Sequence, residues 1–268
     1  MIPILTSAYL APVHYYTKLV SAPCVIEERS EHYVKQTFRN RCVIATADGV
    51  QSLTIPVQGR KELGGDHKTP TRDMRIIDHN RWRQLHWNAL VAAYDRTPFF
   101  EYFADDFAAI YQGEYEYLVA FNADLQRLVL KLLDLHPKII VNQDEYLLLD
   151  DKGKLVNESH RDEDVMSFLS EIASTAPSFS EGDLGDLDEY NKKQSPSIGK
   201  FLDFRENIRP KIDYRFDATF SPAPYYQVFA QRHGFLPNLS IVDSSLIWGL
   251  KVESCLGIPS FKSKKTTS

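Results

Sequence analysis

Three cationic side chains share the odd-numbered positions of the segment 35–41, which reads Lys-Gln-Thr-Phe-Arg-Asn-Arg. Successive side chains of a β-strand point to opposite faces, so a strand here would present Lys35, Arg39 and Arg41 on one face. The planar guanidinium group of arginine fits a carboxylate or a phosphate. The spacing therefore indicates an anion-binding face, although a cationic strand face exposed to solvent would show the same pattern.

A second group of candidate residues lies in the segment 80–87, which reads Asn-Arg-Trp-Arg-Gln-Leu-His-Trp. On a helix, Arg83 and His86 are three residues apart and share a face. A histidine near its usual pKa can transfer a proton at neutral pH, and a neighbouring arginine can stabilise developing negative charge. The alternative is structural, because Trp82 and His86 are four residues apart and would pack together at the edge of a core.

His14 is the third candidate, since it follows the first apolar segment and stands near the start of the next predicted helix. In open α/β sheets, ligands bind at the carboxyl ends of strands and at helix N-termini. An apolar strand followed by Pro-x-His is weakly similar to the opening of nucleotidyltransferases. Those enzymes carry a second histidine where this chain has Tyr15 and Tyr16, so nucleotidyl transfer is the weakest of the hypotheses.

The sequence lacks the signatures of several functional classes. It contains no Walker loop and no Gly-x-Gly-x-x-Gly, His-Glu-x-x-His or Gly-x-Ser-x-Gly motif. Its 8 histidines follow no metal-ligand spacing, so no metal site is predicted and the cofactor is unknown. A net charge of -5 argues against general nucleic-acid binding. No apolar run reaches the roughly 20 residues that span a bilayer.

The location of the protein is expected to be the cytoplasm. The 3 cysteines are widely spaced and suggest no disulfide framework. The N-terminus has no basic residues before its apolar stretch, so a signal peptide is not expected. The sequence gives no indication of the oligomeric state.

The first 57 residues predict a β-α-β unit followed by a hairpin. Apolar residues predict strands at 2–10 and 23–27 with a helix at 13–20 between them, which implies neighbouring parallel strands. The cationic segment, continued to residue 44, would pair with a strand at 51–57 across an Ala-Asp-Gly turn. Residues 58–73 are polar and predict a loop.

The remainder predicts a helical region and then a short mixed segment. Helices are expected at about 79–95, from 97 and at about 115–135, with Asp78 capping the first one. Strands are expected at 139–141 and 146–149, and a short helix at 164–174. An acidic stretch at 176–199 predicts a flexible insertion, a compact segment returns at 201, and a disordered tail is expected at 256–268.

Asp243 ends an alternation of apolar and polar residues at 239–242 that is typical of a short strand. It could also cap a helix that begins near Ser244, and the cap is the favoured interpretation. The elements together predict an α/β fold. It combines an N-terminal βαβ-type, Rossmann-like sheet and a β-hairpin with a helical region and a short C-terminal α+β segment, in a single domain over 1–255.

Four blocks of the sequence resemble the WbqC-like proteins. They are Tyr9-Leu10 with 15–19, residues 35–41, residues 82–100 around Trp82, His86, Trp87, Tyr94 and Pro98, and residues 225–243. The resemblance runs from about residue 6 to about residue 250 and is weakest across 157–200. The chain departs from the family pattern at 6–12 and at 245–248, where Ser-Leu-Ile-Trp replaces the usual Leu-Leu-Phe-Asn, so any role of that asparagine is absent.

The resemblance implies a bacterial protein linked to O-antigen or other surface-polysaccharide synthesis, and some family members are labelled glycine transferases. We therefore expect an acyl or aminoacyl transferase that acts on a small-molecule or nucleotide-linked amino sugar. In this hypothesis His86 is the general base and Arg83 stabilises negative charge. The expected substrate-binding residues are Lys35, Arg39, Asn40, Arg41, Tyr9, His14 and Asp243. The alternative is a non-catalytic module that binds an anionic sugar or nucleotide precursor and needs no base.

Overall fold

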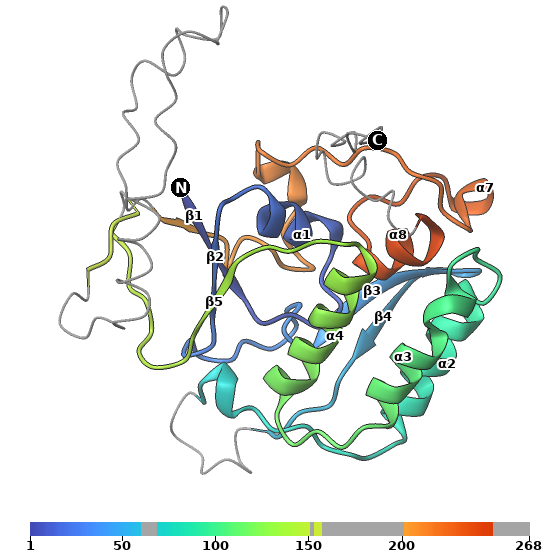
Figure 1. Ribbon diagram of the computed structural model, residues 1–268, viewed down its shortest axis with the longest axis horizontal. Helices are drawn as coiled ribbons and strands as arrows, with labels where there is room; N and C mark the ends of the chain where they lie inside the picture. Colours follow the sequence, from blue (N-terminus) through green and yellow to red (C-terminus); the bar gives the residue numbers. More distant parts are fainter. Residues whose placement is uncertain (60–68, 151–152, 157–200, 249–268) are drawn as a thin grey trace, which may run out of the picture.

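A four-stranded parallel sheet brings together strands from the beginning, the middle and the later part of the chain (Figure 1). The computed structural model describes residues 1–59, 69–150, 153–156 and 201–248. The strands lie in the order β5-β2-β1-β6, with bounds β1 (Ile2–Thr6), β2 (Val25–Glu28), β5 (Ile139–Asn142) and β6 (Phe201–Asp203). Every residue of β1 is buried, which explains its continuous apolar sequence, because an inner strand of a parallel sheet is covered on both faces.

Helix α1 (Val13–Val20) connects β1 to β2, which confirms the predicted β-α-β unit. The two strands are parallel, with Ile4 level with Ile26. Pro12 stands immediately before the helix, where its missing N–H leaves no helical hydrogen bond unmade. The α/β class predicted from the sequence is therefore correct.

The predicted hairpin is also present, with strands β3 (Arg41–Thr46) and β4 (Gly49–Thr54) paired antiparallel. Gly49 begins β4 with a φ of 112°, a left-handed value that a residue with a Cβ atom rarely adopts. Cys42 and Ile44, which are two residues apart in β3, are both buried, as expected for side chains on one face of a strand.

The strand predicted for 35–41 is wrong for all but its last residue. Residues 35–40 form turns and bends, and four consecutive residues from Thr37 to Asn40 are buried, whereas a half-buried strand would bury every second one. Two backbone carbonyls of this segment accept hydrogen bonds from distant parts of the chain. The carbonyl of Phe38 accepts from the N–H of Tyr9 at 2.8 Å, and the carbonyl of Arg39 accepts from the side chain of Asn122 at 2.8 Å.

Three helices form the helical region, with bounds α2 (Trp82–Tyr94), α3 (Phe100–Gln112) and α4 (Leu118–Leu132). Helix α3 packs between α2 and α4 (Figure 1). Helix α2 begins three residues later than predicted because Asn80 and Arg81 are left-handed, with φ values of 58° and 51°. Asp78 does not cap it, and its carboxylate pairs instead with Arg83.

The remaining elements are short, with bounds η1 (Thr71–Asp73) before α2, and η2 (Tyr214–Phe216), α7 (Ala230–His233) and α8 (Ile241–Trp248) after β6. The strand predicted at 146–149 is wrong, since only Leu149 makes an isolated bridge, to Leu155. The strand predicted at 239–242 is also wrong, because the segment binds the loop after β1 and then turns into α8. The predictions for 164–174, 176–199 and 256–268 lie outside the described residues.

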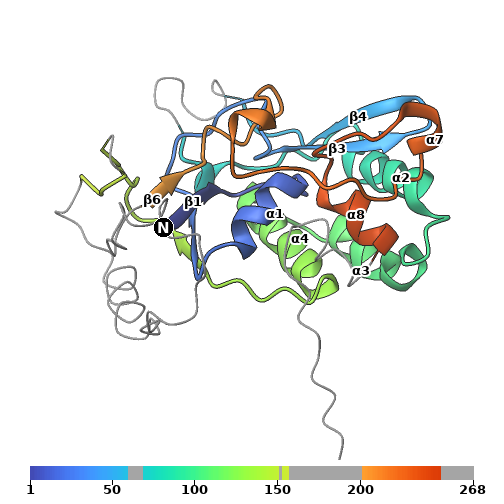
Figure 2. The same ribbon diagram turned by 90° about the horizontal axis from the view of Figure 1, so that it is seen from above.

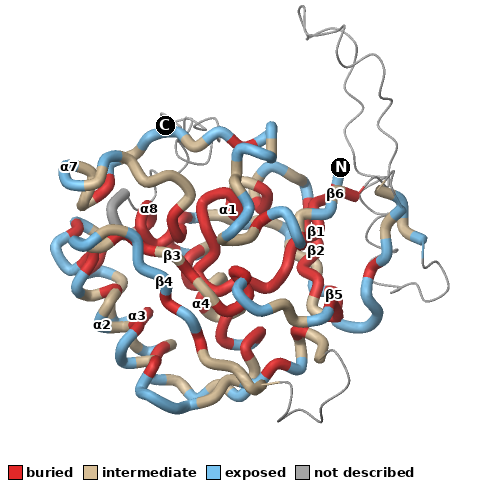
Figure 3. The backbone as a smooth tube through the Cα atoms, turned by 180° about the vertical axis from the view of Figure 1, so that it is seen from behind, coloured by how far each residue is buried: buried red, intermediate tan, exposed pale blue. Residues whose placement is uncertain are grey.

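One large apolar core joins the two halves of the fold, which are the parallel sheet with α1 and the helical region with the hairpin. It includes Leu5 of β1, Ile44 of β3, Phe107 of α3 and Val242 of α8. Helix α8 contacts α2, α3, α4 and β3, so it lies among the helices and the hairpin (Figure 2). From behind, the buried residues form the centre of the molecule, and the outward faces of α2 and α3 are exposed (Figure 3).

Candidate functional site

The guanidinium group of Arg39 is buried and already holds a carboxylate. Its Nε and Nη2 donate to the two carboxylate oxygens of Glu31 at 2.7 and 2.6 Å, and Nη2 also lies 3.4 Å from Oε1 of Glu206. Burial raises the pKa of Glu31, and the hydrogen bonds from Arg39 oppose that shift. The anion predicted for Arg39 is thus supplied by the chain itself.

The other residues of the cationic segment lie around the hairpin. Nε of Arg41 donates to the hydroxyl of Thr54 across the two strands at 3.0 Å. The side-chain amide of Asn40 donates to the carbonyl of Ile55 at 2.8 Å, and Lys35 is exposed on a turn. Among the described residues, no hydrogen bond or ion pair links Lys35 or Arg41 to the carboxylates that hold Arg39.

Helix α2 places Arg83 and His86 against the ring of Trp82, whose centroid lies 4.8 Å from the Arg83 guanidinium carbon and 5.2 Å from the His86 ring. Arg83 donates to Asp78 at 2.9 Å. Nδ1 of His86 lies 3.0 Å from the hydroxyl of Tyr9. Burial lowers the pKa of His86 to about 4, so the ring is neutral at pH 7. This environment agrees with the structural alternative, and a role of His86 as base stays a prediction.

Asp243 lies inside the first turn of α8 and is fully buried, so the predicted cap is wrong. Its Oδ1 accepts from the hydroxyl of Tyr94 at 3.0 Å, and its Oδ2 accepts from the hydroxyl of Tyr225 at 2.8 Å. Burial raises the pKa of Asp243 to about 6, although hydrogen bonds from Tyr225, Tyr94 and Gln227 oppose the shift. The carboxyl therefore joins α8 to α2 and to the segment that contains Tyr225.

The start of α1 is covered by the segment that precedes α8. The N–H of Val13 donates to the carbonyl of Leu239 at 3.0 Å, and the N–H of His14 donates to Oδ1 of Asn238 at 3.1 Å. A phosphate bound at a helix N-terminus needs such N–H groups free. The structural basis of the nucleotidyltransferase hypothesis, an open helix start beside His14, is therefore missing.

His14 instead belongs to a compact group of charged and polar side chains on α1 and the segment 217–220. Its Nε2 lies 2.7 Å from Oδ2 of Asp217, and the ammonium of Lys18 lies 2.5 Å from the same oxygen. Lys18 also donates to the hydroxyl of Thr219 at 2.6 Å. The ring of His14 stacks on Phe220 with centroids 4.3 Å apart. The buried side chains of His14 and Lys18 thus both contact the carboxylate of Asp217.

The charge state of this group follows from burial and hydrogen bonding. Burial alone would raise the pKa of Asp217, but hydrogen bonds from Lys18, Thr219 and His14 outweigh it and hold that pKa well below its usual value. Burial lowers the pKa of His14. At neutral pH the group therefore contains one cation, Lys18, one anion, Asp217, and a neutral imidazole.

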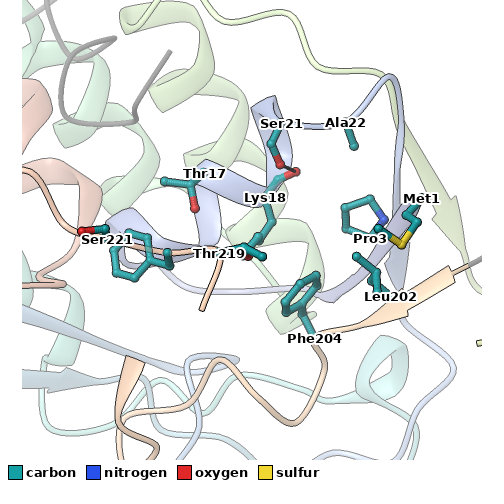
Figure 4. A pocket seen from close by; sticks show the side chains of 11 residues that line it. Met1, Pro3, Thr17, Lys18, Ser21, Ala22, Leu202, Phe204, Thr219 and Ser221 are labelled. Carbon is teal, nitrogen blue, oxygen red and sulfur yellow. Dashed lines mark hydrogen bonds between the residues drawn. The ribbon is translucent and has the colours of Figure 1, made fainter. Parts of the chain in front are cut away.

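Lys18 and Thr219 line a pocket of about 530 Å³ (Figure 4). The pocket, here called the Lys18 pocket, is bounded by the start of β1, the last turns of α1, the end of β6 and the segment 219–221. Figure 4 shows the Lys18 side chain reaching toward Thr219, with Phe204 beside it. Its lining residues are Met1, Pro3, Thr17, Lys18, Ser21, Ala22, Leu202, Phe204, Thr219, Phe220 and Ser221.

Sequence reasoning found one member of this group, His14, and missed Lys18, Asp217 and Thr219. The signal for Lys18 was present, because His14 and Lys18 are four residues apart and share a face of α1. Asp217 is 203 residues from His14, and no local pattern of sequence marks it as a partner. Among the described residues, no group of three or more His, Cys, Asp or Glu side chains is placed to hold a metal ion.

The family model of the WbqC-like proteins matches residues 7–181, more than half of the chain. The chain belongs to the WbqC-like protein family. It is also 31% identical over 121 residues to the "Uncharacterized protein Rv1507c" of Mycobacterium tuberculosis, over 45% of this chain and 50% of that protein. The chain thus spans about half the length of this curated relative, and no solved structure matches.

The WbqC-like match covers only part of the residues gathered here. His14, Lys18, Arg39 and His86 fall within residues 7–181, whereas Asp217 lies beyond them. The last block of the resemblance, at 225–243, also lies beyond the matched residues. None of the helices described is long and apolar enough to cross a membrane.

Proposed function

We propose that this WbqC-like protein binds an amino-sugar precursor of bacterial surface polysaccharide in the Lys18 pocket and transfers an acyl or aminoacyl group to it. The observation that carries the proposal is the buried side chain of Lys18, which lines a pocket of about 530 Å³ and is paired with Asp217. A buried charged group at the wall of a cavity marks a candidate binding site. The link to surface polysaccharide comes from the family.

The lining of the pocket supports a hydroxyl-rich ligand. Hydroxyl groups of Thr17, Ser21, Thr219 and Ser221 offer hydrogen bonds to a sugar, and Phe204 offers an apolar face to its ring. An ammonium group has three N–H donors, and the hydrogen bonds of Lys18 to Asp217 and Thr219 use two of them. The third donor suits a hydroxyl or carbonyl oxygen of the substrate.

The transfer step needs little from the protein beyond this donor. A free amine is a good nucleophile, so its nitrogen attacks the carbonyl carbon of the acyl donor directly. As the N–C bond forms, the bond from that carbon to the leaving group of the donor breaks, and the amine proton leaves with that group or to water. Lys18 stabilises the negative charge that develops on the carbonyl oxygen, the usual task of an oxyanion-binding cation.

Binding of glucosamine and of UDP-N-acetylglucosamine, measured by saturation-transfer NMR and titration calorimetry, tests the proposal. Lys18→Met keeps the length of the side chain and removes the donor, so we expect affinity to fall about tenfold. Lys131→Met removes an exposed lysine of α4 and should leave affinity unchanged. Ser221→Phe fills the pocket from an exposed position and leaves both residues of the ion pair unchanged, and it should weaken binding as Lys18→Met does. Equal affinity in all four proteins would refute the pocket.

A binding module without catalysis is the second candidate, and the surroundings of the histidines favour it. Neither His14 nor His86 lines the Lys18 pocket, and both rings are buried against aromatic neighbours. Turnover separates the two functions. A transferase forms an N-acylated sugar from a thioester donor and an amino sugar, detected by mass spectrometry, and Lys18→Met lowers that rate. A binding module gives no product while sugar binding persists.

A further inference from the structure

A second pocket, of about 520 Å³, lies next to the first and is lined by different residues. Tyr214 lines the second pocket and packs edge-on against Phe220 of the Lys18 pocket, with ring centroids 5.6 Å apart. The second pocket is bounded by the segment 209–215, by the hairpin residues Val43 and Val50, and by the segment 236–239. We call it the Arg209 pocket, after the cation in its wall.

Arg209 belongs to a chain of alternating charges that ends in the buried pair of Arg39 and Glu31. Glu206 forms an ion pair with Arg209 and also lies 3.4 Å from Nη2 of Arg39. Glu31 holds Arg39 from the other side at 2.6 and 2.7 Å. The four groups carry two positive and two negative charges, so the cluster is neutral only while Glu206 stays in place.

Glu206 is the exposed member of this cluster. Its side chain is 55% exposed, whereas those of Arg39 and Glu31 are 1% and 5% exposed. Its contact with Arg39 is long for a charge-assisted hydrogen bond, which usually measures about 2.7–2.9 Å. Its other carboxylate oxygen pairs closely with Arg209. An ion pair of an exposed carboxylate contributes little to stability, so another anion can replace Glu206.

Arg209 also has an unused donor. Its Nε is buried and has no hydrogen-bond partner among the described residues. A buried N–H without a partner costs free energy, so a bound acceptor at this place would stabilise the protein. Both guanidinium groups contact the Glu206 carboxylate, so the group of Arg39, Glu31 and Arg209 has a net charge of about +1 once Glu206 turns away.

We propose that the Arg209 pocket binds a phosphate or carboxylate group of a ligand with an apolar or aromatic body, and that this group replaces the Glu206 carboxylate between Arg209 and Arg39. The body of the ligand lies against Phe38 and Tyr214, which line the same pocket. Of the cationic residues in the segment 35–41, Arg39 is the one that contributes to this anion site. The site is separate from the Lys18 pocket and goes beyond the proposed sugar binding.

The experiment uses phenyl phosphate, benzoate and inorganic phosphate as probes, titrated into the full chain by calorimetry at constant ionic strength. Glu206→Gln removes the carboxylate that competes with the ligand for Arg209 and Arg39. Phenyl phosphate should therefore bind about fivefold more tightly to this variant. Arg209→Gln should weaken it about tenfold, the size of one charge-assisted contact. Arg215→Gln is the matched control, since Arg215 lines the same pocket but is exposed and paired with Asp213.

Phenyl phosphate should bind more tightly than inorganic phosphate, because only the former reaches the apolar wall. Comparison with benzoate tells which anion the site prefers. Arg209→Lys keeps the charge and should retain measurable binding, which separates loss of the cation from loss of the fold. Glu206→Gln binding no more tightly than the wild type would overturn the proposal, as would equal losses in Arg209→Gln and Arg215→Gln. Lys18→Met should leave phenyl phosphate binding unchanged, so the two pockets are tested independently.

Discussion

Asp243 and His86 are buried ionisable residues whose pKa values are shifted in opposite ways. Burial raises the pKa of the Asp243 carboxyl to about 6 and lowers the pKa of the His86 imidazole to about 4. Both shifts have the same cause, since a buried group resists becoming charged. The effects on stability are opposite between pH 4 and 6, because the folded protein binds a proton at Asp243 and lacks one at His86 relative to the unfolded chain.

Asp243→Asn should therefore change how stability depends on pH. Between pH 3.8 and about 6 the folded Asp243 keeps a proton that the unfolded chain has released, so raising the pH favours unfolding. The wild type should lose up to about 3 kcal/mol relative to Asp243→Asn as the pH rises through this range. Denaturant unfolding at a series of pH values measures the difference. Parallel stability curves for the two proteins would contradict the shifted pKa.

The groups that donate hydrogen bonds to Asp243 include two tyrosines. Tyr94 lies on α2 and Tyr225 in the segment before α7, and both donate hydrogen bonds to the carboxyl. Burial holds the pKa of Tyr94 well above its usual value. His86 titrates in both proteins, so its contribution cancels in the comparison.

At the scale of single residues, the sequence showed which side chains carry charge but not which ones they meet. Arg39 was predicted to bind an anionic part of a substrate, and its partners in the structure are Glu31 on the same loop and Glu206, 167 residues further along. His14 was singled out without Asp217. Such pairs are formed by the tertiary fold, and periodicity along the chain contains no information about them.

Periodicity was a better guide at the scale of elements. The apolar stripe of α4, spaced by three and four, correctly predicted a core helix, because burial of one helical face repeats at that interval. The strand predicted for the segment 35–40 was wrong because its cationic residues lie in two different environments. Arg39 is buried in an ion pair, while Lys35 is exposed on a turn where Gln36 has a φ of 60°.

The end of α3 depends on a close approach to Gly113. The φ of Gly113 is -66°, which any residue can adopt, so the need for glycine comes from space and not from the backbone. A Cβ atom there would lie 2.8 Å from Cε2 of Tyr115. Tyr115 has little freedom to move, because it packs edge-on against Phe121 and donates a hydrogen bond to Asp124 at 2.7 Å.

Gly113→Ala should therefore destabilise the protein by about 1–3 kcal/mol, the usual cost of overpacking. Denaturant unfolding monitored by circular dichroism measures the loss. In a Tyr115→Ala background the same substitution should cost much less, because the clashing ring is gone. Additive losses in the double variant would show that the contact with Tyr115 is not the cause.

At the scale of the whole molecule, the parallel sheet and the helical region share one core. Leu5 of β1 belongs to the same apolar cluster as Leu90 of α2 and Phe121 of α4. Strand β6, which begins at residue 201, pairs with β1 at the other end of the chain. The sheet also has a smaller apolar cluster of its own, which includes Ile4 and Ile26. Because the larger cluster contains residues of both the sheet and the helical region, the described residues should unfold as one cooperative unit.

Leu5→Ala tests this cooperativity with a probe far from the substitution. Leu5 is 1% exposed, so its truncation should cost about 2–5 kcal/mol. Trp82 and Trp87 lie on α2, in the helical region, and report on its unfolding by fluorescence. If the core is shared, Leu5→Ala should lower the denaturant midpoint of the fluorescence transition as much as the midpoint measured by far-UV circular dichroism. Leu85→Ala changes an exposed leucine one turn from Trp82 and should shift neither. If the sheet and the helical region unfolded separately, Leu5→Ala would leave the tryptophan transition in place, and the shared apolar cluster would not hold them together.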